Sequence, residues 1–188
     1  MIYFISDLHF GHERILEFER TQFKTIEEHD NYIIQEYNKV VEEKDTCYIL
    51  GDLGFGVKKA HIKECLDQLH GTKIIILGNH DEMKKSFFST LNGDVQYYDH
   101  PIYLNKRIVL SHVPVKVDDD VINVHGHLHN AVLDLPNYIN VNAHIIKYKP
   151  LSFREVMDKV STMKKNSIKF GEEWYKDSYK VLNPSLPR

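Results

Sequence analysis

Apolar and polar positions along the chain fall into two recurring patterns. Six short apolar runs are rich in β-branched or aromatic side chains, which is typical of buried strands. These runs are Ile2–Ile5, Thr46–Leu50, Lys73–Leu77, Arg107–Leu110, Val121–Val124 and Tyr138–Val141. The pattern predicts six strands, and a polar cluster directly follows most of them.

Three longer stretches show the spacing of amphipathic helices. They are Thr25–Val41, Ile62–Leu69 and Ser152–Met163. The first opens with "TIEE", which has the form of a capping box, and Gly71 after the second suits a C-terminal stop. From Val95 onward the strands follow one another with little room for helices. The chain is therefore predicted to be an α/β protein with a β-rich second half and a helix near the end.

Composition adds little to this picture, with 42% hydrophobic and 27% charged residues in a chain of 188. The formal charge of −3, from 24 Lys and Arg against 27 Asp and Glu, gives no overall attraction to nucleic acid or anionic membranes. Cys47 and Cys65 form no CxxC pair, so both are expected to be reduced core residues. Neither a signal peptide nor an apolar span of membrane length is found, and we expect a cytoplasmic protein.

The domain organisation is expected to be simple. We predict one domain over residues 1–165 and a C-terminal extension over residues 166–188. The extension contains four large aromatic side chains, Phe170, Trp174, Tyr175 and Tyr179. Such a segment is expected to pack on its own domain or, as the alternative, on a partner in a homodimer.

Chemistry-bearing residues collect in five clusters at the predicted strand ends. The clusters are Asp7-Leu8-His9, Gly51-Asp52, Gly78–Asp81, His112 and Gly126–His129. In α/β sheets ligands bind beyond the carboxyl ends of the strands, so these clusters are expected to converge on one crevice. His127 and His129 alternate, so both could face one side. Any one cluster alone is common in solvated loops; the five in this order predict a joint site.

The side-chain types in these clusters suit metal ions. Carboxylate, imidazole and amide oxygen without thiolate favour Mn, Fe, Zn or similar divalent ions. Seven candidate ligands exceed what one ion needs and suffice for two ions that share a carboxylate, with positions left open for water and substrate. The candidates are Asp7, His9, Asp52, Asn79, His112, His127 and His129.

The series D-x-H, G-D, G-N-H-D, H and G-H-x-H, spanning Ile2 to His129, resembles the calcineurin-like metallophosphoesterases. Segments such as "FISDLHFGH", "YILGDLGFG" and "VHGHLHN" are similar to small bacterial and phage members. The resemblance implies an αββα four-layer sandwich with a two-metal centre on one edge. It implies a first ion held by Asp7, His9, Asp52 and His129, and a second held by Asp52, Asn79, His112 and His127.

The mechanism implied is hydrolysis of a phosphoester by in-line attack of a hydroxide that bridges the two ions. Mn is the favoured metal, with Fe, Zn, Ni or Co as alternatives. His80 is expected to donate a hydrogen bond or a proton on the leaving-group side, as the catalytic residue. Asn79, beside the substrate, and His12 are the expected substrate-binding residues. Asp81 is expected to orient His80 or a backbone amide, or to cap the turn.

Differences between this sequence and other branches of the superfamily narrow the range of expected substrates. The segment "GDLGFGV" has Phe55 where protein Ser/Thr phosphatases of the superfamily carry a second Asp, which disfavours that activity. The short interval between His112 and His127 leaves little room for a lid, and an open cleft suits phosphodiesters, including small nucleotides. A phosphodiesterase is favoured, with a phosphomonoesterase or nuclease as the alternative. A protein-binding scaffold would show gaps in the motifs, and a nucleic-acid-binding module without catalysis would show a basic patch with interleaved aromatics. The sequence shows neither feature, so both functions are disfavoured.

Overall fold

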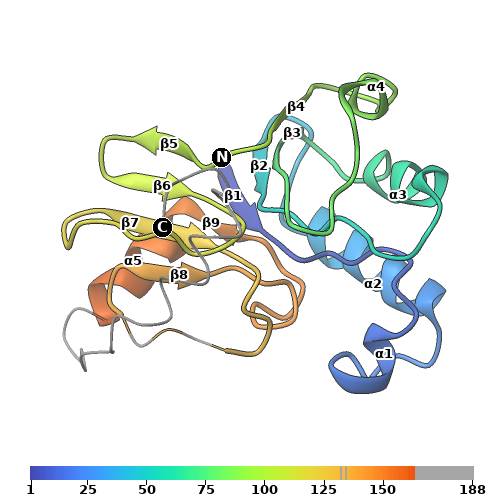
Figure 1. The fold of residues 1–188 in the computed structure, drawn as a ribbon, viewed down its shortest axis with the longest axis horizontal. Coiled ribbons are helices and arrows are strands. Elements are labelled where there is room, and N and C mark those ends of the chain that lie inside the picture. The colour runs from blue at the N-terminus through green and yellow to red at the C-terminus, as the bar shows by residue number, and fades with distance from the viewer. Residues whose placement is uncertain (132, 134, 164–188) are drawn as a thin grey trace, which may run out of the picture.

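A computed structural model describes residues 1–131, 133 and 135–163 (Figure 1). The extension predicted for residues 166–188, and the expected domain end at residue 165, lie outside the described residues. Within the described part of the chain, no helix combines the length and the apolar character needed to cross a membrane.

A five-stranded sheet forms one half of the fold. Its strands, in spatial order, are β4 (Val95–Tyr98), β3 (Thr72–Ile76), β2 (Thr46–Ile49), β1 (Ile2–Ile5) and β9 (Leu151–Ser152). Neighbours from β4 to β1 pair in parallel, and β9 pairs antiparallel with β1. Parallel pairing aligns the carboxyl ends of β1, β2 and β3 at one edge of the sheet.

A four-stranded sheet forms the other half. It consists of β5 (Ile102–Asn105), β6 (Ile108–Leu110), β7 (Ile122–His125) and β8 (Tyr138–Asn140). The β6–β7 and β7–β8 pairs are parallel, whereas β5 pairs antiparallel with β6. All six predicted strands are present. β4, β5 and β9 were not predicted as strands, because the first two have half-exposed side chains and β9 is only two residues long.

Five helices accompany the sheets in the described residues. They are α1 (Ile15–Phe18), α2 (Ile26–Asn38), α3 (Lys59–Leu66), α4 (Lys85–Phe88) and α5 (Phe153–Met163). The three predicted helices are confirmed, although α2 ends at Asn38 rather than at Val41. The single-turn helices α1 and α4 are too short to show a periodic pattern.

Two apolar cores lie between the layers of the fold. The first lies between the five-stranded sheet and helices α2 and α3, where Ile33 and Leu66 pack on strand residues such as Ile49. The second lies between the two sheets and includes Val156 and Val160 of α5. α5 also contacts β8 and β9. These layers, visible in Figure 1, confirm the α/β class and the two-sheet sandwich.

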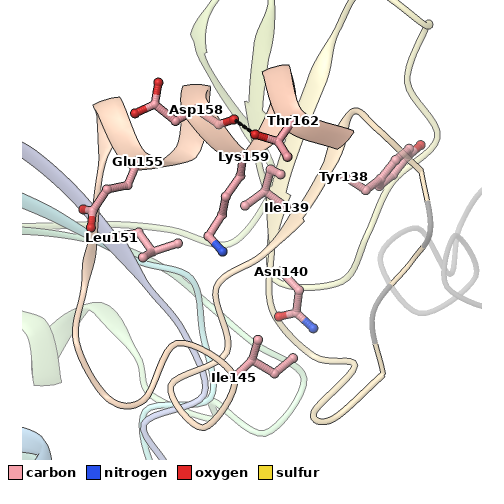
Figure 2. Close-up of a pocket in the computed structure, with 9 residues that line it drawn as sticks. All are labelled: Tyr138, Ile139, Asn140, Ile145, Leu151, Glu155, Asp158, Lys159 and Thr162. Atoms are coloured by element: carbon pink, nitrogen blue, oxygen red, sulfur yellow. Dashed lines mark hydrogen bonds between the residues drawn. The ribbon is translucent and has the colours of Figure 1, made fainter. Parts of the chain in front are cut away.

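A groove of about 650 Å³ runs between α5 and β8 (Figure 2). Ile139, Leu151 and Lys159 are among its lining residues, and Thr162 Oγ1 donates a hydrogen bond to Asp158 O at 2.9 Å on the same helix. None of the predicted ligands lines this groove. The predicted chemistry therefore belongs to another part of the sandwich.

Candidate metal centre

The ends of five strands meet where the two sheets adjoin. β1, β2 and β3 lead into Asp7, Asp52 and Asn79, and β6 and β7 lead into His112 and His127. Backbone hydrogen bonds join the strand ends within each sheet, where Asp7 N donates to Gly51 O and Gly126 N to His112 O, both at 2.9 Å. Ser6 N donates to Val141 O at 2.9 Å and joins one sheet to the other. The expected convergence of the clusters is therefore found in the structure.

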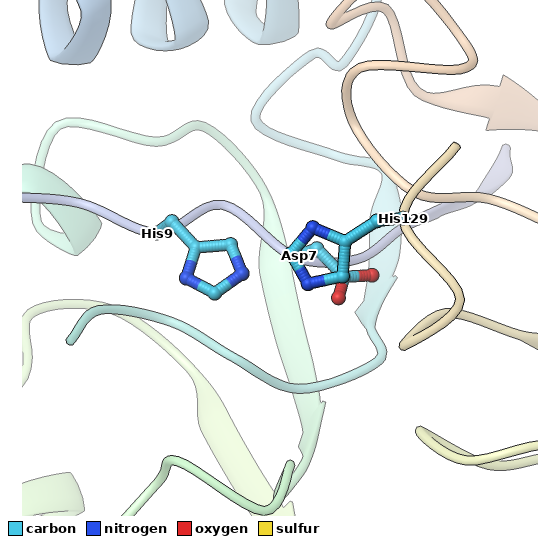
Figure 3. A group of neighbouring side chains, drawn as sticks. All are labelled: Asp7, His9 and His129. Carbon is cyan, nitrogen blue, oxygen red and sulfur yellow. The ribbon is translucent and has the colours of Figure 1, made fainter. Parts of the chain in front are cut away.

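Asp7, His9 and His129 form the first group of this centre (Figure 3). Each offers a ligand atom, and these atoms all lie within 4.8 Å of one another. His9 is only 1% exposed, and its Nε2 is buried without a hydrogen-bond partner. That nitrogen lies 3.7 Å from Asp52 Oδ2, so an unpartnered imidazole nitrogen faces a carboxylate. A bound cation would satisfy both.

Asp52, Asn79 and His127 surround Nε2 of His112 in a second group. His112 Nδ1 donates a hydrogen bond to Leu50 O at 2.8 Å, which leaves Nε2 unprotonated in the neutral ring. This Nε2 lies 3.0 Å from Asn79 Oδ1, 3.3 Å from His127 Nδ1 and 3.4 Å from Asp52 Oδ1. In that form of the ring, two oxygen atoms face a nitrogen lone pair, an arrangement that a cation among them would stabilise.

The protonation of the histidines also suits metal ligation. Burial lowers the pKa of His9 well below its usual range and that of His127 to about 4. Both imidazoles are therefore neutral near pH 7, which is the form that binds metals. The orphaned His9 nitrogen, the converging lone pairs and the neutral rings together show that the residues present fit a divalent-ion site.

Glu19 and Arg20 support this centre, and sequence reasoning missed both. The Glu19 carboxylate accepts a hydrogen bond from His129 Nδ1, which raises the pKa of His129. Nε2 is then the His129 atom that would bind a metal ion. Arg20 is fully buried and donates to the carbonyl oxygens of Leu8, at 2.8 Å, and Asp7. No local pattern marks either residue, because their partners are distant in the sequence or are backbone atoms.

Asp81 acts on the backbone of the neighbouring turns. Its Oδ2 accepts hydrogen bonds from the amides of Asp52 and Gly78, both at 2.8 Å, and its Oδ1 accepts from Leu53 N at 2.9 Å. Of the roles considered from the sequence, two are therefore observed: Asp81 orients the backbone amides of Asp52 and Leu53, and it caps its own turn through Gly78 N. Burial raises the pKa of Asp81 to about 6.

His80 and His12 lie on the exposed side of the centre. The ring centroid of His80 is 6.3 Å from that of His9, and His12 Nδ1 lies 3.4 Å from His9 Nδ1. The backbone amide of His80, not its ring, donates to Asp52 Oδ1 at 3.2 Å. Phe55 lies between the two histidines, with ring centroids 4.5 Å from His80 and 4.9 Å from His12.

The backbone at the centre is strained. Five of the seven candidate ligands have φ between 46° and 67°, in the left-handed region that non-glycine residues rarely adopt: Asp7, His9, Asp52, His127 and His129. The two histidines of the G-H-x-H segment therefore reach the centre through left-handed turns, not through the alternation of an extended strand. Such strain persists only where the surrounding structure imposes it and is concentrated at functional sites.

Gly78 is required here by space. Its φ is not positive, so the backbone conformation does not require glycine. A Cβ at this position would instead collide with the Asp52 carboxylate and lie 2.5 Å from Asp52 N. The chain needs glycine because the β2 and β3 exits approach so closely.

Comparisons with known proteins agree with this geometry. The sequence profile of the calcineurin-like phosphoesterases matches residues 1–184. The uncharacterized protein MJ1445 of Methanocaldococcus jannaschii is 33% identical over 162 residues, which cover 80% of this chain and 86% of that protein. The gene 66 protein of Mycobacterium phage L5 is 29% identical and covers 70% and 78%.

A solved structure is similar as well. The crystal structure of AQ665 from Aquifex aeolicus, a protein of unknown function, superposes with a TM-score of 0.67 and is 29% identical. The match covers 84% of this chain and 98% of that one. From the family match across nearly its whole length and the two-sheet fold with Asp and His gathered at the strand ends, the chain belongs to the calcineurin-like phosphoesterase family.

Proposed function

We propose that the protein is a binuclear metal-dependent phosphodiesterase that hydrolyses a small nucleotide or related diester. The observation that carries the proposal is the convergence of seven candidate N and O ligands, including His9 with its unpartnered Nε2, at one edge of the sandwich. An acidic chain needs such a local positive charge to bind an anionic phosphoester. We favour Mn²⁺, with Fe, Zn, Ni or Co as alternatives, since N and O ligands without a thiolate suit these divalent ions.

The ligands divide between two ions. Asp7, His9, Asp52 and His129 would hold the first, and Asp52, Asn79, His112 and His127 the second. When bound, the two ions would supply an activated water and neutralise charge on the phosphoryl oxygens. Asp52 faces both groups, at 3.7 Å from His9 Nε2 and 3.4 Å from His112 Nε2, which supports a bridging role.

The exposed histidines act on the substrate. His80 touches the centre through its backbone amide, so its imidazole is free to donate a hydrogen bond to the phosphoryl group or a proton to the departing alkoxide. His12, next to His9, binds a phosphoryl oxygen. The amide oxygen of Asn79 adds a ligand without adding negative charge near the phosphate.

Exposed aromatic rings beside these histidines favour a nucleotide. Phe55 is 43% exposed and Phe18 is 63% exposed, and both contact the ring of His12. Rings of this kind stack on nucleobases, with about 1–3 kcal/mol per base. An uncovered aromatic pair at the edge of a phosphate site therefore suits a substrate with a planar base.

The first test compares hydrolysis of bis-p-nitrophenyl phosphate and p-nitrophenyl phosphate by chelator-stripped protein, with and without Mn²⁺. We expect metal-dependent cleavage that prefers the diester, and no cleavage by the Asp52→Asn variant. A preference for the monoester would assign a phosphomonoesterase. Inactivity with every divalent ion would reject the enzyme in favour of a protein-binding scaffold.

A second test addresses the nucleotide. We expect Phe55→Ala to raise KM about 10-fold for the p-nitrophenyl ester of thymidine 5′-monophosphate, because base stacking is lost. KM for methyl p-nitrophenyl phosphate should stay unchanged. Tyr103→Ala, at an aromatic residue of β5 that is 69% exposed, is the matched control. Equal effects on both substrates would contradict stacking on Phe55.

A further inference from the structure

A second cluster of metal-ligating side chains lies between α2 and α3. Asp30 comes from α2, and His61 and Cys65 come from α3. The two α3 residues are four positions apart, so they share one face of the helix. Ligand atoms of the three side chains lie within 4.8 Å of one another. Unlike the seven candidate ligands above, this cluster contains a thiol.

The distance between the two α3 side chains matches that of a tetrahedral zinc site. His61 Nε2 lies 3.6 Å from Cys65 Sγ. Zinc bonds of about 2.0–2.1 Å to nitrogen and 2.3 Å to sulfur place these two atoms about 3.6 Å apart in a tetrahedron. Asp30 Oδ2 lies 2.6 Å from His61 Nε2, which is a hydrogen-bond distance, so these two atoms would separate to about 3.4 Å to bind one tetrahedral zinc ion.

The carboxylate of Asp30 is already held in place by other hydrogen bonds. Its Oδ1 lies 2.7 Å from Nδ1 of the buried His29, and its Oδ2 accepts from Gly11 N at 3.0 Å. Outer hydrogen bonds of this kind orient ligands at metal sites. The His61 side chain is 37% exposed, which opens a path for an ion and a water, whereas Cys65 is buried.

We propose that Asp30, His61 and Cys65 bind one thiophilic divalent ion, Zn²⁺ by preference, with water as the fourth ligand. The ion replaces the thiol proton of Cys65, which leaves to solvent, and it binds Nε2 of a neutral His61 imidazole whose single proton is carried on Nδ1. This site is additional to the two-ion centre.

The position of the site gives it a structural consequence. Asp30 holds the amide of Gly11, which lies between His9 and His12 in the loop that follows β1. His29 also connects Asp30 to Arg20, at 2.7 Å from Arg20 Nη1. An ion on Asp30 would therefore brace the loop that carries His9 and His12.

Cobalt titration of the full chain tests the proposal, because a thiolate ligand produces a near-ultraviolet sulfur-to-cobalt charge-transfer band that N and O ligands do not. The chelator-stripped Asp52→Asn variant isolates the site from the two-ion centre. We expect the band to saturate at one equivalent of Co²⁺ and to disappear when Zn²⁺ is added.

Matched variants in the same background identify the ligands. Cys65→Ser should abolish the band, and His61→Asn should weaken Co²⁺ binding at least 10-fold without loss of the circular-dichroism spectrum. Cys47→Ser, at the buried cysteine of β2, should leave the band unchanged. No band, or a band that survives Cys65→Ser, would overturn the proposal, and neither result depends on phosphoesterase activity.

Discussion

At the scale of single residues, the candidate centre is built from conformations and contacts that are unfavourable without a ligand. Left-handed backbone at Asp7 and His127 costs of order 1–3 kcal/mol at each position. The buried His9 Nε2 has no hydrogen-bond partner. Such features persist when the surrounding fold imposes them and a bound group offsets them. They concentrate the predictions at this scale on the ligands and their immediate neighbours.

Replacing His80 separates catalysis from metal binding. Because its backbone amide, which alanine retains, makes the hydrogen bond to Asp52, His80→Ala should keep both ions. Loss of the imidazole should lower kcat about 10²–10⁴-fold. The measurement is steady-state diester hydrolysis with metal content determined on the same sample. His100→Ala, at an exposed histidine, is the control; loss of the ions in His80→Ala would contradict the assigned role.

Replacing Gly78 tests the close approach of the β2 and β3 exits. Gly78→Ala should displace the Asp52 carboxylate, weaken Mn²⁺ binding and lower the free energy of unfolding by about 1–3 kcal/mol. Gly93→Ala is the control: φ there is +80° and nothing lies within 4 Å of a Cβ. It should lose about 1–2 kcal/mol of stability with unchanged Mn²⁺ affinity. Wild-type Mn²⁺ affinity in Gly78→Ala would refute the steric argument.

At the scale of elements, local sequence patterns predicted six of the strands and the three longer helices. α2 begins where the capping box predicts, with Glu28 N donating to Thr25 Oγ1 at 3.1 Å. Glu28 Oε2 in turn accepts from Lys24 N at 2.9 Å. The parallel order of β3, β2 and β1 then carries three polar clusters to one edge. Each of these three strands thus leads into a candidate ligand at its end and contributes apolar side chains along its length.

Removing the N-cap of α2 should measure its contribution to stability. Thr25→Ala leaves Glu28 N without its side-chain acceptor and should lower the free energy of unfolding by about 1 kcal/mol, determined by urea denaturation. Thr25→Ser keeps a hydroxyl acceptor and should lose less. Equal losses in the two variants would show that the hydroxyl is not what stabilises the helix.

At the scale of the whole molecule, the centre joins the two sheets. Asp7 and Asp52 follow strands of one sheet, and His112 and His127 follow strands of the other. Binding of an ion between them therefore requires the folded sandwich. A ligand that binds only the folded state stabilises that state in proportion to its free concentration.

Removal of metal should accordingly lower thermal stability. At a free Mn²⁺ concentration 100 times Kd, each ion should add about 2.7 kcal/mol, so chelation should lower Tm by several degrees in differential scanning calorimetry. Mn²⁺ is chosen because it avoids thiolate ligands. Asp52→Asn should show no Mn²⁺-dependent change in Tm. An equal change in that variant would place the stabilising ions elsewhere.

Sequence alone determined six strands, the three longer helices and most of the candidate chemistry, because apolar periodicity, capping residues and strand-end clusters are local patterns. Tertiary structure decided how the clusters meet and which hydrogen bonds hold them. Glu19 accepts from His129, Arg20 donates to the carbonyl oxygens of Asp7 and Leu8, and Asp81 accepts from backbone amides of two turns. It also decided which candidate ligands adopt left-handed backbone conformations, because these residues are not glycines and their residue type does not indicate a positive φ. These features arise from contacts between segments distant in the chain, and backbone carbonyls and amides that serve as partners have no residue type for a sequence pattern to reveal.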